Sequence, residues 1–179
     1  MLKLISNKSG FSLIELIVVM VLLALLALVG SFGISNAVKS YLSQKSNSAT
    51  AYKGQLAMMR MSKEFKRLTY PVSGSGTSIE YTVYRNGAKE THKLSWSGTS
   101  GDSLLYDDFS SNGIPLVDQV SNFMLEYYDP DVDGTGSTWS SPGSTWSSST
   151  RIIGVTLGLI GTDNISSVFT EKITPRNLP

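Results

Sequence analysis

Apolar residues form one unbroken run near the start of the 179-residue chain and a periodic pattern after it. The run, Leu16 to Val29, holds fourteen residues without one polar side chain. Together with the apolar positions just before it, this run is long enough to cross a bilayer as an α-helix. We predict a transmembrane helix over residues 11–30, preceded by a short polar segment over residues 1–10.

The pattern after the run predicts that the helix continues as an amphipathic stem over residues 31–70. The first proline is Pro71, so nothing in the sequence breaks a helix of about 60 residues, or about 90 Å at about 1.5 Å per residue. Apolar residues recur at helical spacing on two sides, Val38, Tyr41, Leu42, Ala49, Tyr52, Leu56 and Met59 on one and Met58, Met61, Phe65 and Leu68 on the other. We expect one stripe to pack under a sheet. The other packs either on a neighbouring copy or inside a head that wraps the helix end.

Beyond Pro71 the pattern changes to β-branched and aromatic residues separated by glycine and serine, which is typical of strands and turns. Asn86-Gly87 predicts a tight type I′ turn between strands at 79–83 and 90–96. We predict further strands at 104–106, 123–128, 152–160 and 168–173, and loops at 72–78 and 97–103. One long helix followed by antiparallel strands is an α+β arrangement, here with a β-rich head over residues 71–179.

The composition removes several classes of chemistry. The chain has no cysteine and one histidine, which excludes a disulfide framework, a thiol nucleophile and a cysteine-type zinc site. It has neither a Gly-x-Ser-x-Gly motif nor a phosphate-binding glycine loop with a lysine, and we predict that the protein is not an enzyme. We expect the single histidine, His92, to be an exposed or half-buried strand residue.

Charge is distributed unevenly, although the formal net charge is only +1. Residues 31–70 carry seven basic residues and one acidic residue, whereas residues 71–179 carry six basic and twelve acidic residues. A solvated helix face explains the basic stem, and docking between copies or onto anionic lipid headgroups is the alternative. Lys3 and Lys8 precede the apolar run and no basic residue follows it until Lys39, which predicts a cytoplasmic N-terminus and an extracytoplasmic head on the other side of the membrane.

One charged residue, Glu15, lies inside the apolar segment. An ionised side chain in hydrocarbon is costly, so its presence there indicates a function. The residues around it, Gly10-Phe11-Ser12-Leu13-Ile14-Glu15, resemble the prepilin signature of type IV pilins and type II secretion pseudopilins. A secretory signal peptide is the alternative, but Leu28-Val29-Gly30 lacks the usual Ala-x-Ala cleavage pattern.

The resemblance implies that a prepilin peptidase cuts after Gly10 and methylates the new N-terminal Phe11. It also implies a pilin-like fold, a single span of the inner membrane, and later assembly with other pilins or pseudopilins of the same filament on an inner-membrane assembly platform. Glu15 is then expected to meet the α-amine of Phe11 from a neighbouring copy, which neutralises two charges that are costly in apolar surroundings. Because Phe11 has no free amine before cleavage, removal of residues 1–10 exposes the assembly element.

Within this family, segments 123–129, 153–157 and 169–177 are most similar to a J-type minor pseudopilin of the type II secretion system, with a place near the filament tip. A minor pilin of a type IV pilus, serving adhesion, twitching motility or DNA uptake, is the first alternative. Nucleic acid is an expected partner only in DNA uptake. A membrane-tethered periplasmic binding module is the alternative from another class, and none of these functions requires a cofactor.

An acidic loop provides a candidate metal site. Asp129, Asp131 and Asp133 alternate before Gly134, as at the start of an EF-hand calcium loop. Ser140 stands where the closing bidentate glutamate of such a loop belongs. A calcium site and a solvated acidic turn are the two interpretations.

The same loop contains a short repeat. The sequence Gly-Ser-Thr-Trp-Ser-Ser occurs twice and carries Trp139 and Trp146. Two tryptophans in such a loop form either a contact surface for a partner or lids on the sheet. We favour lids, because an exposed indole ring is unfavourable in water.

Overall fold

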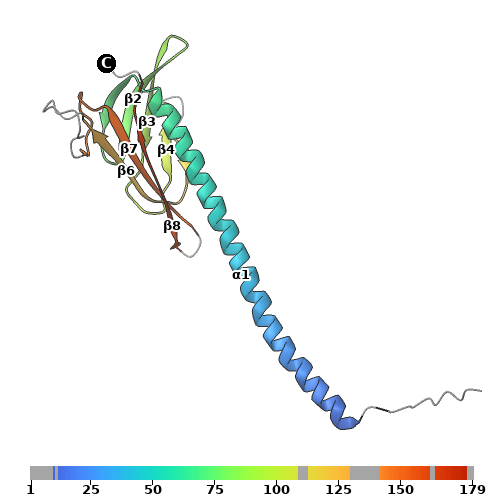
Figure 1. Ribbon diagram of the computed structural model, residues 1–179. Helices are drawn as coiled ribbons and strands as arrows, with labels where there is room; N and C mark the ends of the chain where they lie inside the picture. Colours follow the sequence, from blue (N-terminus) through green and yellow to red (C-terminus); the bar gives the residue numbers. More distant parts are fainter. Residues whose placement is uncertain (1–9, 11, 109–112, 130–141, 162–163, 177–179) are drawn as a thin grey trace, which may run out of the picture. The chain divides into compact units, whose positions relative to one another are not determined.

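A computed structural model describes residues 10, 12–108, 113–129, 142–161 and 164–176 of the chain. One helix is followed by strands, as predicted (Figure 1). The elements are α1 (Leu13–Lys66), β1 (Tyr70–Gly74), β2 (Ser78–Arg85), β3 (Ala88–Ser95), β4 (Leu104–Asp107), β5 (Ile114–Val117), β6 (Val120–Tyr128), β7 (Ile152–Ile160) and β8 (Ser166–Ile173). The chain divides into two compact units, Met1–Gln44 and Lys45–Pro179, and α1 contributes residues to both.

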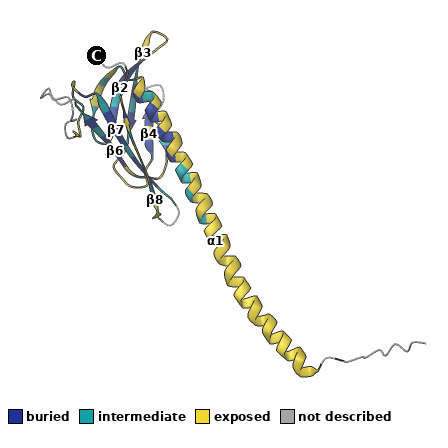
Figure 2. Ribbon diagram, viewed as in Figure 1, coloured by how far each residue is buried: buried dark blue, intermediate teal, exposed yellow. Residues whose placement is uncertain are grey.

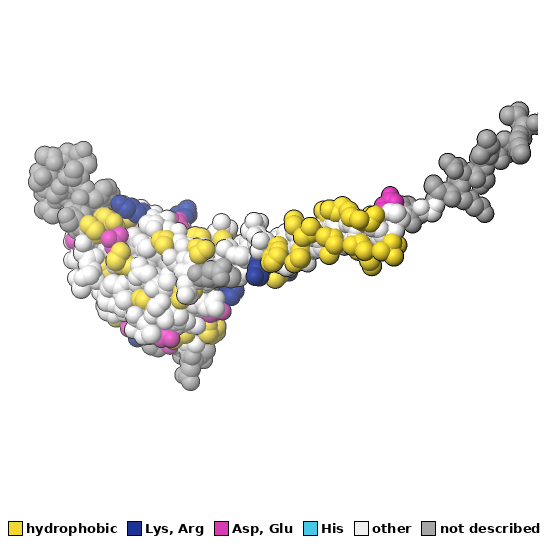
Figure 3. Space-filling view, turned by 90° about the horizontal axis from the view of Figure 1, so that it is seen from below, with side chains coloured by type: hydrophobic (Ala, Val, Ile, Leu, Met, Phe, Trp, Pro, Cys, Tyr) yellow, Lys and Arg dark blue, Asp and Glu magenta, His cyan; other side chains and the backbone are white. Residues whose placement is uncertain are grey.

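The first unit contains the apolar part of α1. Its side chains are exposed along the whole segment (Figure 2), and Leu13 is 80 % exposed. Hydrophobic side chains cover this part of the helix in Figure 3. A helix that is apolar on every side needs an apolar environment, and α1 is long and apolar enough to span a membrane.

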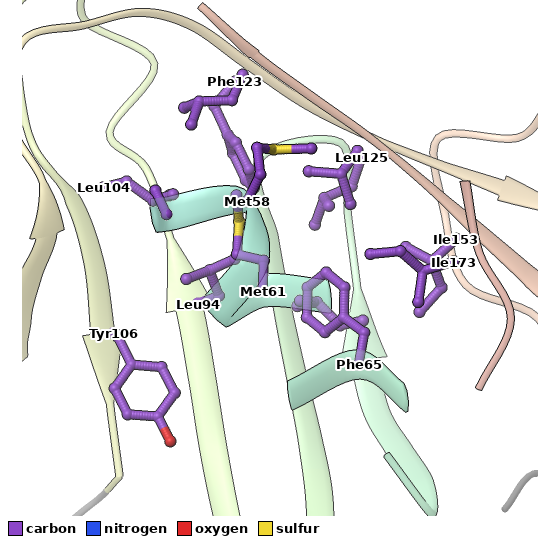
Figure 4. Close-up of a cluster of buried hydrophobic side chains, with 14 of the residues drawn as sticks. Met58, Met61, Phe65, Leu94, Leu104, Tyr106, Phe123, Leu125, Ile153 and Ile173 are labelled. Carbon is purple, nitrogen blue, oxygen red and sulfur yellow. The ribbon is translucent and has the colours of Figure 1, made fainter. Parts of the chain in front are cut away.

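The second unit contains two antiparallel sheets. The first has the strand order β1-β2-β3-β4-β5 and the second the order β6-β7-β8. Residues from both sheets and from the last turns of α1 form one buried core (Figure 4). This is the α+β arrangement that the sequence predicts, with the head built from two sheets.

The structure decides between the two apolar stripes of the stem. Phe65 is 1 % exposed, and its ring packs edge-to-face against Tyr81 with the centroids 5.6 Å apart. Met58, Met61 and Leu68 of the same stripe are also buried. On the other stripe Met59 is 59 % exposed and Tyr52 is 62 % exposed. The stripe that ends at Leu68 therefore packs against the sheets. The stripe that ends at Met59 remains uncovered within the described part of the chain.

Most predicted strands are confirmed, and two strands were missed. Positive φ angles at Asn86 (52°) and Gly87 (81°) confirm the tight turn between β2 and β3. The loop prediction for residues 72–78 was wrong over its first part, where β1 lies, and β5 was not predicted. Both missed strands contain a proline, Pro71 or Pro115, and both lie at an edge of their sheet. An edge strand tolerates proline because one side of its backbone needs no ladder partner.

Gly54 marks a close approach between α1 and β8. A Cβ atom at this position would lie 2.6 Å from Cζ of Phe169. Alanine usually stabilises a helix by about 1 kcal/mol relative to glycine, but overpacking costs about 1–3 kcal/mol. We expect Gly54→Ala to lower the free energy of unfolding by about 1 kcal/mol in urea denaturation of the protein in detergent micelles.

The background variant Phe169→Ala provides the control. Once the ring is removed, the same Gly54→Ala change should stabilise the protein by about 0.5–1 kcal/mol, because only the helix preference remains. The packing explanation would be contradicted if Gly54→Ala changed the free energy of unfolding in the same direction with and without the Phe169 ring.

Candidate functional site

Ser12 sets the start of α1. The N–H of Glu15 donates to Oγ of Ser12 at 3.3 Å, and the N–H of Leu16 donates to the Ser12 carbonyl oxygen at 3.2 Å. Ser12 is therefore the N-cap residue, which satisfies an amide that a helix start leaves unpaired. This role was not predicted from the sequence. The signal was the spacing Ser12-x-x-Glu15, which is that of a capping box.

Glu15 lies in the first turn of α1, next to the apolar run. A carboxylate is favourable there because the helix dipole is positive at its N-terminal end. Among the described residues, no cationic group lies within 4.0 Å of the Glu15 carboxylate. Gly10 is exposed, whereas Phe11 lies outside the described residues. The pairing of Glu15 with the amine of Phe11 therefore stays a prediction.

Asp129 ties the end of β6 to the segment before β7. Oγ of Ser147 donates to both Asp129 carboxylate oxygens, at 3.0 and 2.9 Å, and Oγ of Ser149 donates to Oδ2 at 2.9 Å. Burial acts to raise the pKa of Asp129, but hydrogen bonds from Thr150, Ser149 and Ser147 outweigh it and hold the pKa below its usual value. In this structure the Asp129 carboxylate stabilises a turn.

Calcium binding by the acidic loop stays a prediction, because Asp131 and Asp133 lie outside the described residues. No group of three or more potential metal-ligating side chains occurs within the described ranges. The serine contacts of Asp129 favour the turn interpretation. We therefore expect the melting temperature to be the same in calcium and in EDTA. A rise in calcium that Asp129→Asn abolishes would establish the metal site instead.

Trp146 packs as a lid on the second unit. It is half-buried, and its ring lies edge-to-face on Tyr127 with the centroids 5.7 Å apart. The backbone N–H of Trp146 also donates to the Gly74 carbonyl oxygen at 3.2 Å. The prediction that the ring is a lid on the sheet is thus confirmed for Trp146. Trp139 lies outside the described residues, and a partner-contact role for either ring stays a prediction.

His92 is a buried residue, so the expectation that it is exposed or half-buried was wrong. The residue is 5 % exposed. The His92 Nδ1 atom is 2.7 Å from the Tyr106 hydroxyl, and Nε2 is 3.5 Å from Oε2 of Glu90. Burial and the charge of Glu64 raise the pKa of Tyr106 to about 12, so Tyr106 keeps its proton at neutral pH. The neighbours of His92 along the chain gave no sign of this burial, because the rings that stack on it, Tyr81 and Tyr106, come from β2 and β4.

The exposed apolar helix, its capped start and the antiparallel head define a pilin-like α+β arrangement. Comparison with protein families supports the same class. Residues 5–31 match the family model described as the prokaryotic N-terminal methylation motif, which supports a type IV pilin-like or pseudopilin-like protein. The motif implies processing by a prepilin peptidase and assembly with other pilins. A comparison with curated proteins gave no match.

Proposed function

We propose that the protein is a minor pseudopilin, a structural subunit of a type II secretion pseudopilus that lies near the filament tip. The peptidase removes residues 1–10, Phe11 becomes the methylated N-terminus, and the helix then moves from the inner membrane into the filament. The observation that carries this proposal is the methylation motif over residues 5–31, at the start of a helix whose apolar side chains are all exposed over its first part.

Two further features support a filament subunit. The apolar part of α1 has no covering residues within the described chain, so lipid before assembly and neighbouring helices after it both suit its surface. The uncovered stripe with Tyr52, Leu56 and Met59 continues apolar surface along the stem in the second unit. Pilin-like proteins are typically structural, and this surface serves packing between subunits and needs no chemistry.

Mass spectrometry of the mature protein tests the proposed processing. We expect an N-terminus at a methylated Phe11 when the chain is produced together with a prepilin peptidase. The variant Gly10→Leu is the control, and it should retain residues 1–10 because the prepilin signature places the cut after a glycine. Functional protein that still begins with Met1 would contradict the proposal.

The neighbouring subunits distinguish the proposed pseudopilin from a minor pilin of a type IV pilus. Cross-linking in the native membrane, followed by identification of the partners, separates the two. Pseudopilins and secretion-platform proteins as partners support the proposal. Major pilin subunits as partners indicate a role in adhesion, twitching motility or DNA uptake.

A further inference from the structure

A polar cavity of about 240 Å³ lies in the second unit between α1 and the strands β2, β3 and β4. Arg60, Lys63, Arg67 and Arg85 surround it, and all four are exposed. His92 and Tyr106 also line it, and both are buried. We propose that this cavity, which we call the basic pocket, binds a carboxylate group of a partner molecule.

Three of the four cations have no carboxylate within ion-pair distance in the described part of the chain. Among the residues that the structure describes, no acidic side chain lies within 4.0 Å of the charged nitrogens of Arg60, Lys63 or Arg67. The Arg60 guanidinium lies 4.9 Å from the centre of the Tyr106 ring, a contact that holds it over the pocket. Arg85 only approaches Glu90, with Nη1 and Oε2 4.0 Å apart. The pocket therefore presents donors whose ionic partner the described chain does not supply.

The buried side of the pocket is polar. The Tyr106 hydroxyl and His92 Nδ1 lie 2.7 Å apart, and the two rings stack with centroids 5.5 Å apart. In Figure 4 the Tyr106 hydroxyl points away from Leu94 and the apolar cluster. The pocket is thus lined by residues from α1, β2, β3 and β4. The packing of these four elements together fixes the positions of the lining side chains.

The charge balance favours a carboxylate over a phosphate. The lining carries four basic side chains and three acidic ones, Glu64, Glu90 and Asp108. Apart from His92, the charged side chains of the lining sum to +1, so the single charge of a carboxylate balances them, whereas a dianion leaves an excess negative charge. Guanidinium groups bind a carboxylate through two parallel hydrogen bonds, which suits Arg60 and Arg67. An acidic side chain, a polypeptide C-terminus and a free organic acid all provide this group.

The single histidine provides a direct reporter for the test, because its Cδ2–H and Cε1–H groups give the only pair of histidine ring signals in a ¹H–¹³C NMR spectrum. The full chain in detergent micelles is titrated with three probes: acetate, N-acetylglycine as a mimic of a C-terminus, and N-acetylglutamic acid α-amide as a mimic of an acidic side chain. N-acetylglycinamide is the neutral control. We expect a saturable shift of the His92 signal with the carboxylates only, weakened by added salt.

Matched variants locate the binding. Lys63→Gln and Arg67→Gln should each raise the Kd about tenfold, because each removes a charge-assisted hydrogen bond. Lys66→Gln is the control, since Lys66 is exposed in the same last turn of α1 but does not line the pocket, and it should leave the Kd within about twofold.

The probes also separate the sources of the carboxylate. Tighter binding of either peptide mimic than of acetate indicates a polypeptide partner, and equal binding indicates a free acid; both results support the pocket. Tighter binding of inorganic phosphate, no saturable shift with any carboxylate, or equal weakening by Lys66→Gln would overturn the proposal. The titration uses unassembled protein, so its failure is distinct from failure of the proposed filament function.

Discussion

Glu15→Ala should abolish incorporation into the filament while leaving cleavage after Gly10 and methylation of Phe11 intact. The prediction rests on the proposed function. Without the Glu15 carboxylate, the charged amine of Phe11 is left unpaired among apolar helices. Breaking a buried ion pair by removing one partner costs about 3–5 kcal/mol, which corresponds to a loss of about 100-fold or more in the assembly equilibrium. The measurement is the amount of the protein in sheared filaments relative to the membrane fraction.

Two variants separate the ion pair from the helix cap. Glu15→Gln keeps a polar side chain in the first turn but removes the charge, and we expect it to fail like Glu15→Ala. Ser12→Ala removes the observed cap and costs about 1 kcal/mol of helix stability, yet it keeps the carboxylate and should still assemble. If Glu15→Gln assembled normally and Ser12→Ala did not, the result would contradict the ion pair. It would show instead that assembly depends on the helix cap.

Phe65→Ala should lower the free energy of unfolding of the second unit by about 3–5 kcal/mol, the usual cost of removing a buried aromatic ring. The Phe65 side chain is 1 % exposed and belongs to the core that α1 and both sheets share (Figure 4). Its contact with Tyr81 is lost as well. Urea denaturation of the protein in detergent micelles, followed by tryptophan fluorescence, measures the change.

Met59→Ala is the matched control on the uncovered stripe. Met59 is 59 % exposed and precedes Phe65 on the same helix. We expect this substitution to change the free energy of unfolding of the second unit by no more than about 0.5 kcal/mol, as for most surface substitutions. A loss comparable to that of Phe65→Ala would mean that the uncovered stripe also contributes to the core of the unit.

The parts of the fold that local patterns encode were predictable. The helix, the turn at Asn86-Gly87 and the strands that became β2, β3, β4, β6, β7 and β8 each follow from periodicity, turn residues and β-branched composition within the segment itself. β1 and β5 were not predictable in this way, because a proline argues against a strand unless the strand is known to lie at an edge. Edge positions are a property of the sheet order, which no single segment contains.

The sequence by itself determined the apolar helix, its proline-free continuation, the Gly10-to-Glu15 signature and the α+β order of elements. These features depend on neighbouring residues along the chain, so the chain alone carries them. Only the tertiary structure decided which stripe of the stem is buried, that Trp146 is a lid, and that His92 lies beneath a basic pocket. Each of these depends on contacts between elements that are separate in the sequence, as Tyr106 meets His92 when β4 pairs with β3 and Phe65 meets Tyr81 when α1 packs on β2.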